Sequence, residues 1–173
     1  TVAIAKLLEV DDEPIVQTLT TFSGIKHRLQ YVAEVKERKF YNDSKATNVL
    51  AAAQALQSFD QPILWICGGL DRQEDLSPLL PLVEAHVKGI LAVGENKGDF
   101  IQLGEKAGLA PVKSCDELEE AVELAFNWSD EGDVILLSPA SASWDQYESF
   151  EIRGDVFIDA VTNLSQTEKN EEA

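Results

Sequence analysis

The segment Asn42-Asp43-Ser44-Lys45-Ala46-Thr47-Asn48 joins a β-prone run, residues 32–41, to a helical run, residues 46–59. It places a carboxylate, an ammonium group and two hydroxyl groups where a strand passes into a helix. Backbone N–H groups at the start of a helix are unpaired and favour anions. We therefore interpret this junction as part of an anion-binding site in an α/β protein.

A second polar cluster, residues 138–145, directly follows another apolar run much later in the chain. Ligands of parallel sheets bind beyond the carboxyl ends of the strands, so the two junctions are expected to contribute to one site. At the first junction, Ser44 is the expected N-cap of the helix. Lys45 and Thr47 then lie in its first turn, where the helix dipole favours an anion.

Strands and helices alternate along most of the chain. Residues 30–35 and 40–41 are expected to form a hairpin or a bent pair around a polar turn at 36–39. Further strands are expected at 63–67, 89–93, 111–113 and 134–137, and helices at 46–59, 76–85, 97–107, 117–128 and 151–164. This pattern predicts an α/β, Rossmann-like fold, with a mostly parallel sheet of about six strands and helices on both faces.

The two ends of the chain are expected to differ from this α/β domain, which we assign to residues 22–164. Residues 1–21 are predicted to form two helices, at 2–9 and 13–21, with Asp12 as the N-cap of the second and Pro14 near its first turn. Residues 165–173 are predicted to be a frayed polar tail. The sequence has no methionine and begins at Thr1, so we expect the chain to be part of a longer protein.

The composition excludes several classes of function. The net charge is −17, with 14 Lys and Arg against 31 Asp and Glu, which argues against nucleic acid or an anionic membrane as a partner. No signal peptide is visible. Cys67 and Cys115 lack CxxC spacing, which indicates reduced thiols in a cytoplasmic protein. His27 and His86 are the two histidines, and they show no metal-ligand spacing.

Five motifs in register resemble the C-terminal domain of the Mur ligase family. They occur in the order that the family has, and they span most of residues 22–164. The motifs are Gly24-Ile25-Lys26-His27-Arg28, residues 42–48, Gly68-Gly69-Leu70-Asp71-Arg72, residues 138–145 and Phe150-Glu151-Ile152-Arg153-Gly154-Asp155. The first junction is most similar to that of the members that add D-glutamate to UDP-N-acetylmuramoyl-L-alanine. Residues 1–21 then resemble the end of the central ATPase domain.

The resemblance implies one set of residues for D-glutamate and another for ATP. The residues implied for the substrate are Thr47, Arg72, Ser143, Trp144 and Phe150. Those implied for ATP are Arg28, Asp43 and Lys45. Arg72 stands where many members have a lysine, and Ser141 stands where they usually have a cysteine. The resemblance assigns no catalytic residue and no metal ligand to this chain.

The resemblance also implies the reaction of a complete ligase in peptidoglycan synthesis. ATP phosphorylates the L-alanine carboxylate of the UDP-linked precursor, and the amine of D-glutamate attacks the acyl phosphate to give an amide, ADP and phosphate. Mg²⁺ neutralises phosphate charge and is expected mainly on the central domain. The chain has no G-x-x-x-x-G-K-[ST] phosphate loop, so it is expected to be inactive alone.

Two alternatives remain open. The chain could be the same domain of another amide ligase of the Mur or folylpolyglutamate type, although these generally have a different first junction. A non-catalytic α/β module that binds an anionic metabolite is the alternative from another class. The coding sequence upstream of Thr1 distinguishes them, because a phosphate loop there supports a ligase.

Overall fold

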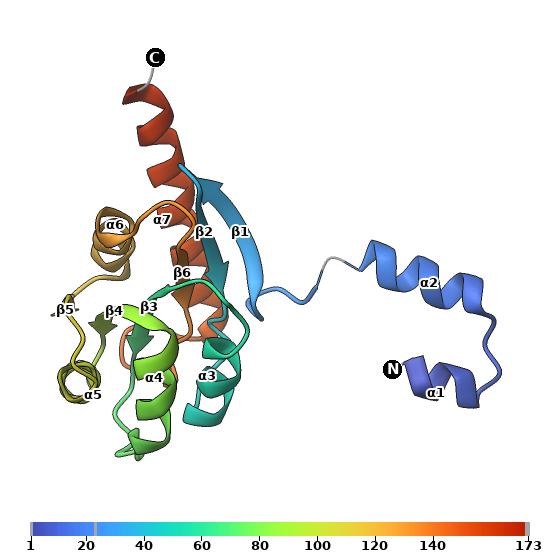
Figure 1. Cartoon of the computed structure of the whole chain (residues 1–173), viewed down its shortest axis with the longest axis horizontal. Helices are drawn as coiled ribbons and strands as arrows, with labels where there is room; N and C mark the ends of the chain where they lie inside the picture. Colours follow the sequence, from blue (N-terminus) through green and yellow to red (C-terminus); the bar gives the residue numbers. More distant parts are fainter. Residues whose placement is uncertain (1, 23, 172–173) are drawn as a thin grey trace.

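The computed structural model describes residues 2–22 and 24–171, and six strands form one sheet in the order β1-β2-β6-β3-β4-β5 (Figure 1). β1 is antiparallel to β2, and all other neighbours are parallel. The strands are β1 (Gln30–Val35), β2 (Arg38–Asn42), β3 (Ile63–Gly68), β4 (Val87–Val93), β5 (Val112–Ser114) and β6 (Val134–Leu137). The predicted mostly parallel sheet is confirmed.

Helices cover both faces of the sheet, as the sequence predicts (Figure 1). One face carries α3 (Val49–Leu56), the short 3₁₀ helix η1 (Ser77–Leu79), α4 (Leu80–His86) and α5 (Lys97–Lys106). The other face carries α6 (Leu118–Trp128) and α7 (Phe150–Glu171). The sheet therefore lies between two hydrophobic cores, which is why its central strands are apolar on both sides.

β3 shows how the sequence produces this arrangement. Every residue of the strand is buried, and alternate side chains enter opposite cores. Leu64 and Ile66 face α6 and α7, whereas Trp65 faces the other layer and meets Phe100 of α5 edge to face, with ring centroids 5.5 Å apart. The indole N–H of Trp65 donates to the carbonyl of Ser138 (2.8 Å), which fixes the chain where it leaves β6.

The start of α3 differs from the prediction. The N-cap is Asn48, whose Oδ1 accepts from the N–H of Ala51 (2.9 Å). The prediction of Ser44 as the cap is wrong, because its hydroxyl instead donates to the carbonyl of Phe150 (2.7 Å). Lys45 and Thr47 therefore lie before the helix and not in its first turn.

Other elements also differ from the prediction. The predicted helix at 76–85 is divided into η1 and α4, with a proline in the first turn of each. Residues 165–171 were expected to be a frayed tail, but they continue α7 as far as Glu171, and Glu168 forms an ion pair with Lys36. Asp12 lies inside α2, and Asp11 occupies the N-cap position without a side-chain capping bond. Residues 172–173 of the predicted tail lie outside the described residues.

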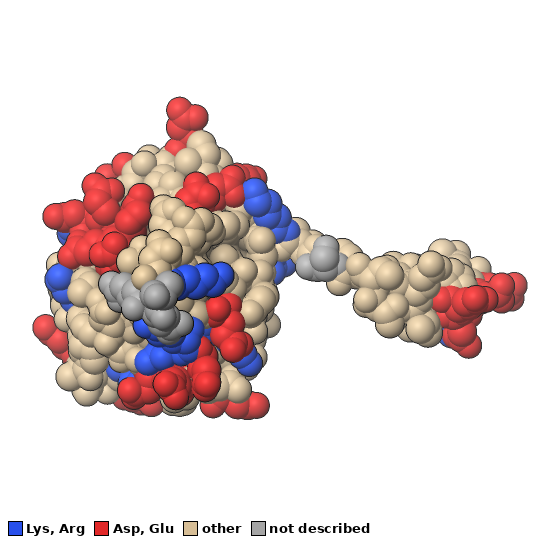
Figure 2. All heavy atoms as spheres, turned by 90° about the horizontal axis from the view of Figure 1, so that it is seen from above, with Lys and Arg blue, Asp and Glu red and all other residues tan. Residues whose placement is uncertain are grey.

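Two helices precede the α/β domain, α1 (Val2–Leu7) and α2 (Asp12–Thr21), and Figure 1 shows them apart from the sheet. Neither contains a buried residue, and Leu7 and Leu8 are 82% and 72% exposed. Figure 2 shows acidic side chains on both parts of the molecule, with basic side chains interspersed on the α/β domain. No helix in the described part of the chain is both long and apolar enough to span a membrane.

Candidate functional site

The carboxyl edge of the sheet collects the polar motifs of the sequence. β2, β6 and β3 are parallel neighbours, so the loops that follow them lie side by side. We name these loops by the preceding strand: the β2 loop (residues 43–48), the β6 loop (138–149) and the β3 loop (69–76). The β4 loop (94–96) lies beyond the β3 loop. Thr47, Ser143 and Arg72 therefore lie on three adjacent loops of one edge.

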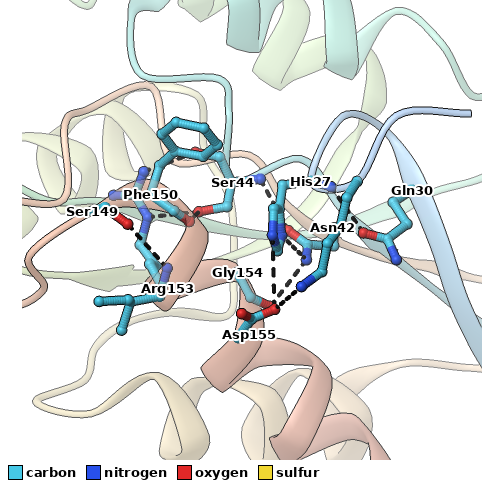
Figure 3. A network of polar contacts seen from close by, with 11 residues as sticks. His27, Gln30, Asn42, Ser44, Ser149, Phe150, Arg153, Gly154 and Asp155 are labelled. Carbon is cyan, nitrogen blue, oxygen red and sulfur yellow. Dashed lines mark hydrogen bonds and ion pairs between the residues drawn. The ribbon is translucent and has the colours of Figure 1, made fainter.

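Arg153 of α7 joins the β2 and β6 loops, and Figure 3 shows it with Ser44 of the β2 loop. Its side chain is 1% exposed. Nε donates to Ser44 Oγ (3.0 Å), and Nη2 donates to the carbonyls of Ser44 (3.0 Å) and Ser141 (3.0 Å). Burial lowers the pKa of the guanidinium to about 10, and the carboxylate of Asp145 opposes that shift. The group is therefore still charged at neutral pH and holds the two loops together.

Arg153 belongs to the predicted motif at residues 150–155, but the sequence alone gives it no role. The position of Arg153 on the helix could have indicated its importance, because Phe157 and Val161 lie one and two turns further along the same helical face and are buried together with Gly154. A charged side chain at such a position needs hydrogen-bond partners, and here they are the hydroxyl of Ser44 and the carbonyls of Ser44 and Ser141. Nη1 of Arg153 is buried without a hydrogen-bond partner among the described residues.

A second buried network ties His27 to the end of β2 (Figure 3). Asn42 Nδ2 donates to His27 Nδ1 (3.0 Å) and to the carbonyl of Gly154 (3.0 Å). With Nδ1 as the acceptor, the ring proton lies on Nε2, which is 3.7 Å from the Asp155 carboxylate. Burial lowers the pKa of His27, although Asp155 opposes this. His27 is therefore a neutral, structural residue that holds the turn before Arg28.

The same network requires a glycine at position 154. A Cβ there would lie 2.2 Å from His27 Nδ1, so the ring and α7 could not both keep their positions. The His27 carbonyl also accepts from the N–H of Lys45 (3.0 Å). These contacts bring Arg28 and Lys45, which are distant in sequence, to the same part of the edge.

Asp43 lies beside a surface cavity of about 340 Å³. Its side chain is 5% exposed, and its two oxygens accept from the N–H of Leu29 (3.1 Å) and the hydroxyl of Ser138 (3.1 Å). Arg28 and Lys45 also line the cavity, together with residues of the β2 loop and α3. The three residues that the resemblance implies for ATP therefore border one cavity.

Burial raises the pKa of Asp43 above its ordinary value of 3.8, against the opposing effects of its two hydrogen bonds and of Arg28. A raised folded-state pKa contributes stability below the unfolded-state pKa, and this contribution is lost as pH rises through the folded-state value. Asp43→Asn cannot titrate. We therefore expect its free energy of unfolding to increase relative to that of the parent as the pH rises through the folded-state pKa of Asp43. Urea unfolding of both proteins at several pH values measures this. A difference in unfolding free energy that does not depend on pH would contradict a raised pKa for Asp43.

Two exposed cations of the edge lie against aromatic rings. The Arg72 guanidinium is 5.0 Å from the ring centroid of Trp144, and the Lys45 ammonium is 3.9 Å from that of Phe150. Trp144 is 65% exposed. Such contacts at exposed sites contribute roughly 0.5–1 kcal/mol, enough to favour one orientation of a flexible side chain. Four residues of the predicted site thus form two cation–aromatic pairs, one between the β3 and β6 loops and one between the β2 loop and the start of α7.

The β6 loop holds Ser143 in a defined conformation. Ser143 is 2% exposed, and its carbonyl accepts from the N–H groups of Gln146 (3.1 Å) and Tyr147 (2.7 Å). Ala140, in the same loop, is buried with a φ of 55°, a conformation that non-glycine residues rarely adopt. The main chain of this loop is therefore strained and tightly bonded, a property common at ligand sites.

The described residues do not by themselves suit Mg²⁺. Across residues 2–22 and 24–171, no group of three or more His, Cys, Asp or Glu side chains is arranged to hold a metal ion. Both thiols are buried, and burial raises the pKa of Cys67 well above its ordinary value and that of Cys115 to about 11, which disfavours the reactive thiolate. The edge offers cations, hydroxyls and main-chain amides, which are groups that suit anions.

Comparison with known proteins identifies the family of the chain. The family model described as "Mur ligase, glutamate ligase domain" matches residues 27–141, which is more than half of the chain. The chain therefore belongs to the family of Mur ligase glutamate ligase domains, as its motifs predict. The matched residues include the β2, β3 and β4 loops and the first part of the β6 loop.

Among its relatives are UDP-N-acetylmuramoylalanine–D-glutamate ligases. That of Bacillus cytotoxicus is 53% identical over 162 residues, and that of Bacillus subtilis (strain 168) is 51% identical over 163 residues. Each alignment covers 94% of this chain and 36% of the relative. The chain thus spans about 36% of the length of these relatives.

Solved structures share the fold at much lower sequence identity. UDP-N-acetylmuramate-alanine ligase MurC from Thermotoga maritima superposes with a TM-score of 0.66 at 12% identity, over 94% of this chain and 36% of that one. E. coli FolC in complex with ADP gives a TM-score of 0.61 at 21% identity, over 93% of this chain and 39% of that one. At such identities the similarity concerns the fold.

Proposed function

We propose that the chain is the C-terminal, amino-acid-binding domain of an ATP-dependent ligase that adds D-glutamate to UDP-N-acetylmuramoyl-L-alanine in peptidoglycan synthesis. The observation that supports this most is the position of Thr47, Arg72 and Ser143 on three adjacent loops of one sheet edge. The names of the relatives agree with it. The complete ligase works in the cytoplasm, where ATP and the nucleotide precursor are found.

The two carboxylates of D-glutamate need two anion subsites. Arg72 and Thr47 bind one carboxylate, and a guanidinium can hold it through two parallel hydrogen bonds. Ser143 and main-chain amides near Trp144 and Phe150 bind the other. The amine takes part in neither subsite, so its nitrogen is left free to react.

ATP binds at the cavity beside Asp43. Each oxygen of that carboxylate already accepts one bond, and each keeps a lone pair for a ribose hydroxyl. Arg28 and Lys45, at the rim, suit the phosphates. Mg²⁺ would neutralise phosphate charge, and its ligands would come from the remainder of the complete ligase.

The chain acts by positioning in this reaction. The nitrogen of D-glutamate attacks the carbonyl carbon of the acyl phosphate formed on L-alanine. A C–N bond forms, the C–O bond to phosphate breaks, phosphate leaves with the electron pair, and the amine releases a proton. Fixing both carboxylates of the attacking amino acid lowers the entropic part of the barrier.

Residues 1–21 belong, in this proposal, to the end of the preceding ATPase domain, and residues 22–164 to the glutamate-binding domain. The exposed leucines of the α1–α2 segment support the assignment, because apolar side chains on a helix pair favour burial against a partner. α7 carries the glutamate-binding domain on to Glu171.

The complete polypeptide that contains this chain provides the test. It should form the amide product from UDP-N-acetylmuramoyl-L-alanine, ATP, Mg²⁺ and D-glutamate, and not from L-glutamate. Product formation with a folate and L-glutamate would favour the folylpolyglutamate-type ligase. A coding sequence without a phosphate loop upstream of Thr1 would favour the anion-binding module.

The chain by itself should release no phosphate from ATP above the buffer rate, with or without D-glutamate. The reason is that it lacks a G-x-x-x-x-G-K-[ST] loop and a cluster of metal ligands among its described residues. A phosphate-release assay measures this, with the complete polypeptide as the positive control. Turnover by the pure chain would contradict a division of the catalytic machinery between domains.

A further inference from the structure

Asn96 bonds to two loops at the carboxyl edge although it belongs to neither. Its Oδ1 accepts from the N–H of Gly69 (2.9 Å), and its Nδ2 donates to Ser141 Oγ (2.9 Å). Its own N–H donates to the carbonyl of Gly69 (3.1 Å). From the β4 loop, one half-buried side chain therefore connects the β3 loop to the β6 loop.

The two loops also contact each other through their main chains. The N–H of Leu70 donates to the carbonyl of Ala142 (2.9 Å). A Cβ at Gly69 would lie 2.3 Å from that same carbonyl oxygen. Gly69 is therefore a point of close approach between the β3 and β6 loops, and Asn96 is bonded to both the N–H and the carbonyl of this residue.

Further contacts hold the β4 loop against its neighbours. Asp145 Oδ2 accepts from the N–H of Glu95 (3.0 Å), and a Cβ at Gly94 would lie 2.5 Å from Gly69 Cα. The β4 loop is thus fixed on one side to the β3 loop and on the other to the β6 loop. Asn96 is the residue in this loop whose side chain reaches both.

We propose that Asn96 is a positioning residue that sets the separation of the two carboxylate subsites for an amino diacid. This inference rests on the proposed function, in which Arg72 of the β3 loop and Ser143 of the β6 loop hold opposite ends of D-glutamate. The substrate has a limited reach between its carboxylates, so a change in the separation of the loops weakens both subsites at once. Asn96 acts through Gly69 and Ser141 and contacts no substrate.

Three variants of the complete polypeptide test this. Asn96→Ala removes both side-chain bonds and is expected to raise the KM for D-glutamate about threefold to tenfold, because a neutral hydrogen bond contributes about 1 kcal/mol. Ser141→Ala removes one bond and is expected to raise it about two- to fivefold. The double variant should have the same KM for D-glutamate as Asn96→Ala, because the single variant Asn96→Ala has already lost the bond between Asn96 and Ser141. The KM for ATP should not change.

Asn163→Ala, at an exposed position on α7, is the matched control and should keep the KM of the parent. A variant that melts at a lower temperature but keeps the parent KM for D-glutamate would mean that Asn96 is merely structural, and the inference would be wrong. The milder Ser141→Ala keeps this outcome measurable if Asn96→Ala folds poorly. A parent polypeptide that makes no product from D-glutamate would contradict the proposed function, and this inference with it.

Discussion

Replacing Arg72 by alanine in the complete polypeptide is expected, on the function proposed above, to raise the KM for D-glutamate by about 10- to 100-fold. A hydrogen bond to a charged group is worth about 1.5–3 kcal/mol, and each 1.4 kcal/mol corresponds to a factor of about ten. Arg72 lies on the β3 loop, whereas Arg28 and Lys45 line the cavity that we propose for ATP. The KM for ATP should therefore remain close to that of the parent in steady-state kinetics.

Two controls make the Arg72 result specific. Arg72→Lys keeps the charge but loses the planar fork of donors. Its KM for D-glutamate should therefore lie between those of the parent and the alanine variant. Lys113→Ala removes an exposed cation on β5 that pairs with Glu120, and it should not change the KM for D-glutamate. Unchanged saturation by D-glutamate in Arg72→Ala would remove this residue from the proposed site.

Arg153→Met should lower the free energy of unfolding of this chain by about 3–5 kcal/mol. The guanidinium makes three hydrogen bonds to Ser44 and Ser141, and methionine would leave the buried carbonyls of both residues unpaired. Urea unfolding measures the change. The loss is a large part of the roughly 5–15 kcal/mol that stabilises a typical domain.

Arg38→Met is the matched control for this prediction. Arg38 is half-buried on β2, and its guanidinium donates to the carbonyl of Ser129 (3.2 Å) while lying 5.5 Å from the Phe126 ring centroid. It is at the other end of the sheet from the site loops and remains accessible to water. Arg38→Met should lower the free energy of unfolding by about 1 kcal/mol. Equal losses in the two variants would show that burial of Arg153 gives it no special importance.

The strands and their layers could be predicted because their signals are local. Residues 63–67 and 134–137 are continuous apolar runs between turns, and the observed strands differ from them by at most one residue. The amphipathic spacing of residues 117–128 similarly predicts the bounds of α6 to within one residue. The family could also be predicted, since five short motifs in one order are far more specific than any one of them.

The cap of α3 could not be predicted from local preference alone. Ser44 and Asn48 are both good N-cap residues, and the sequence does not distinguish them. Ser44 is engaged by Phe150 and Arg153, which are 106 and 109 residues away in the chain. Such partners become visible only when the sheet has placed the loops together.

The position of Asn96 illustrates the same limit. An asparagine in a short turn after a strand ordinarily bonds its own backbone, and sequence reasoning gives it no role. Its actual partners, Gly69 and Ser141, come from two other loops. The helical continuation to Glu171 was missed for a related reason, because residues 165–171 are polar and their attachment through Glu168 depends on Lys36 of the hairpin.

The strand order has a consequence for the synthesis of the protein. β6, which begins at Val134, inserts between β2 and β3, both of which are made much earlier. Until the ribosome has released β6, those two strands have unpaired edges, which can pair with other nascent chains. A premature stop before Val134 would leave these edges open permanently, so truncated products of this gene should be substrates for chaperones and proteases and not stable subdomains.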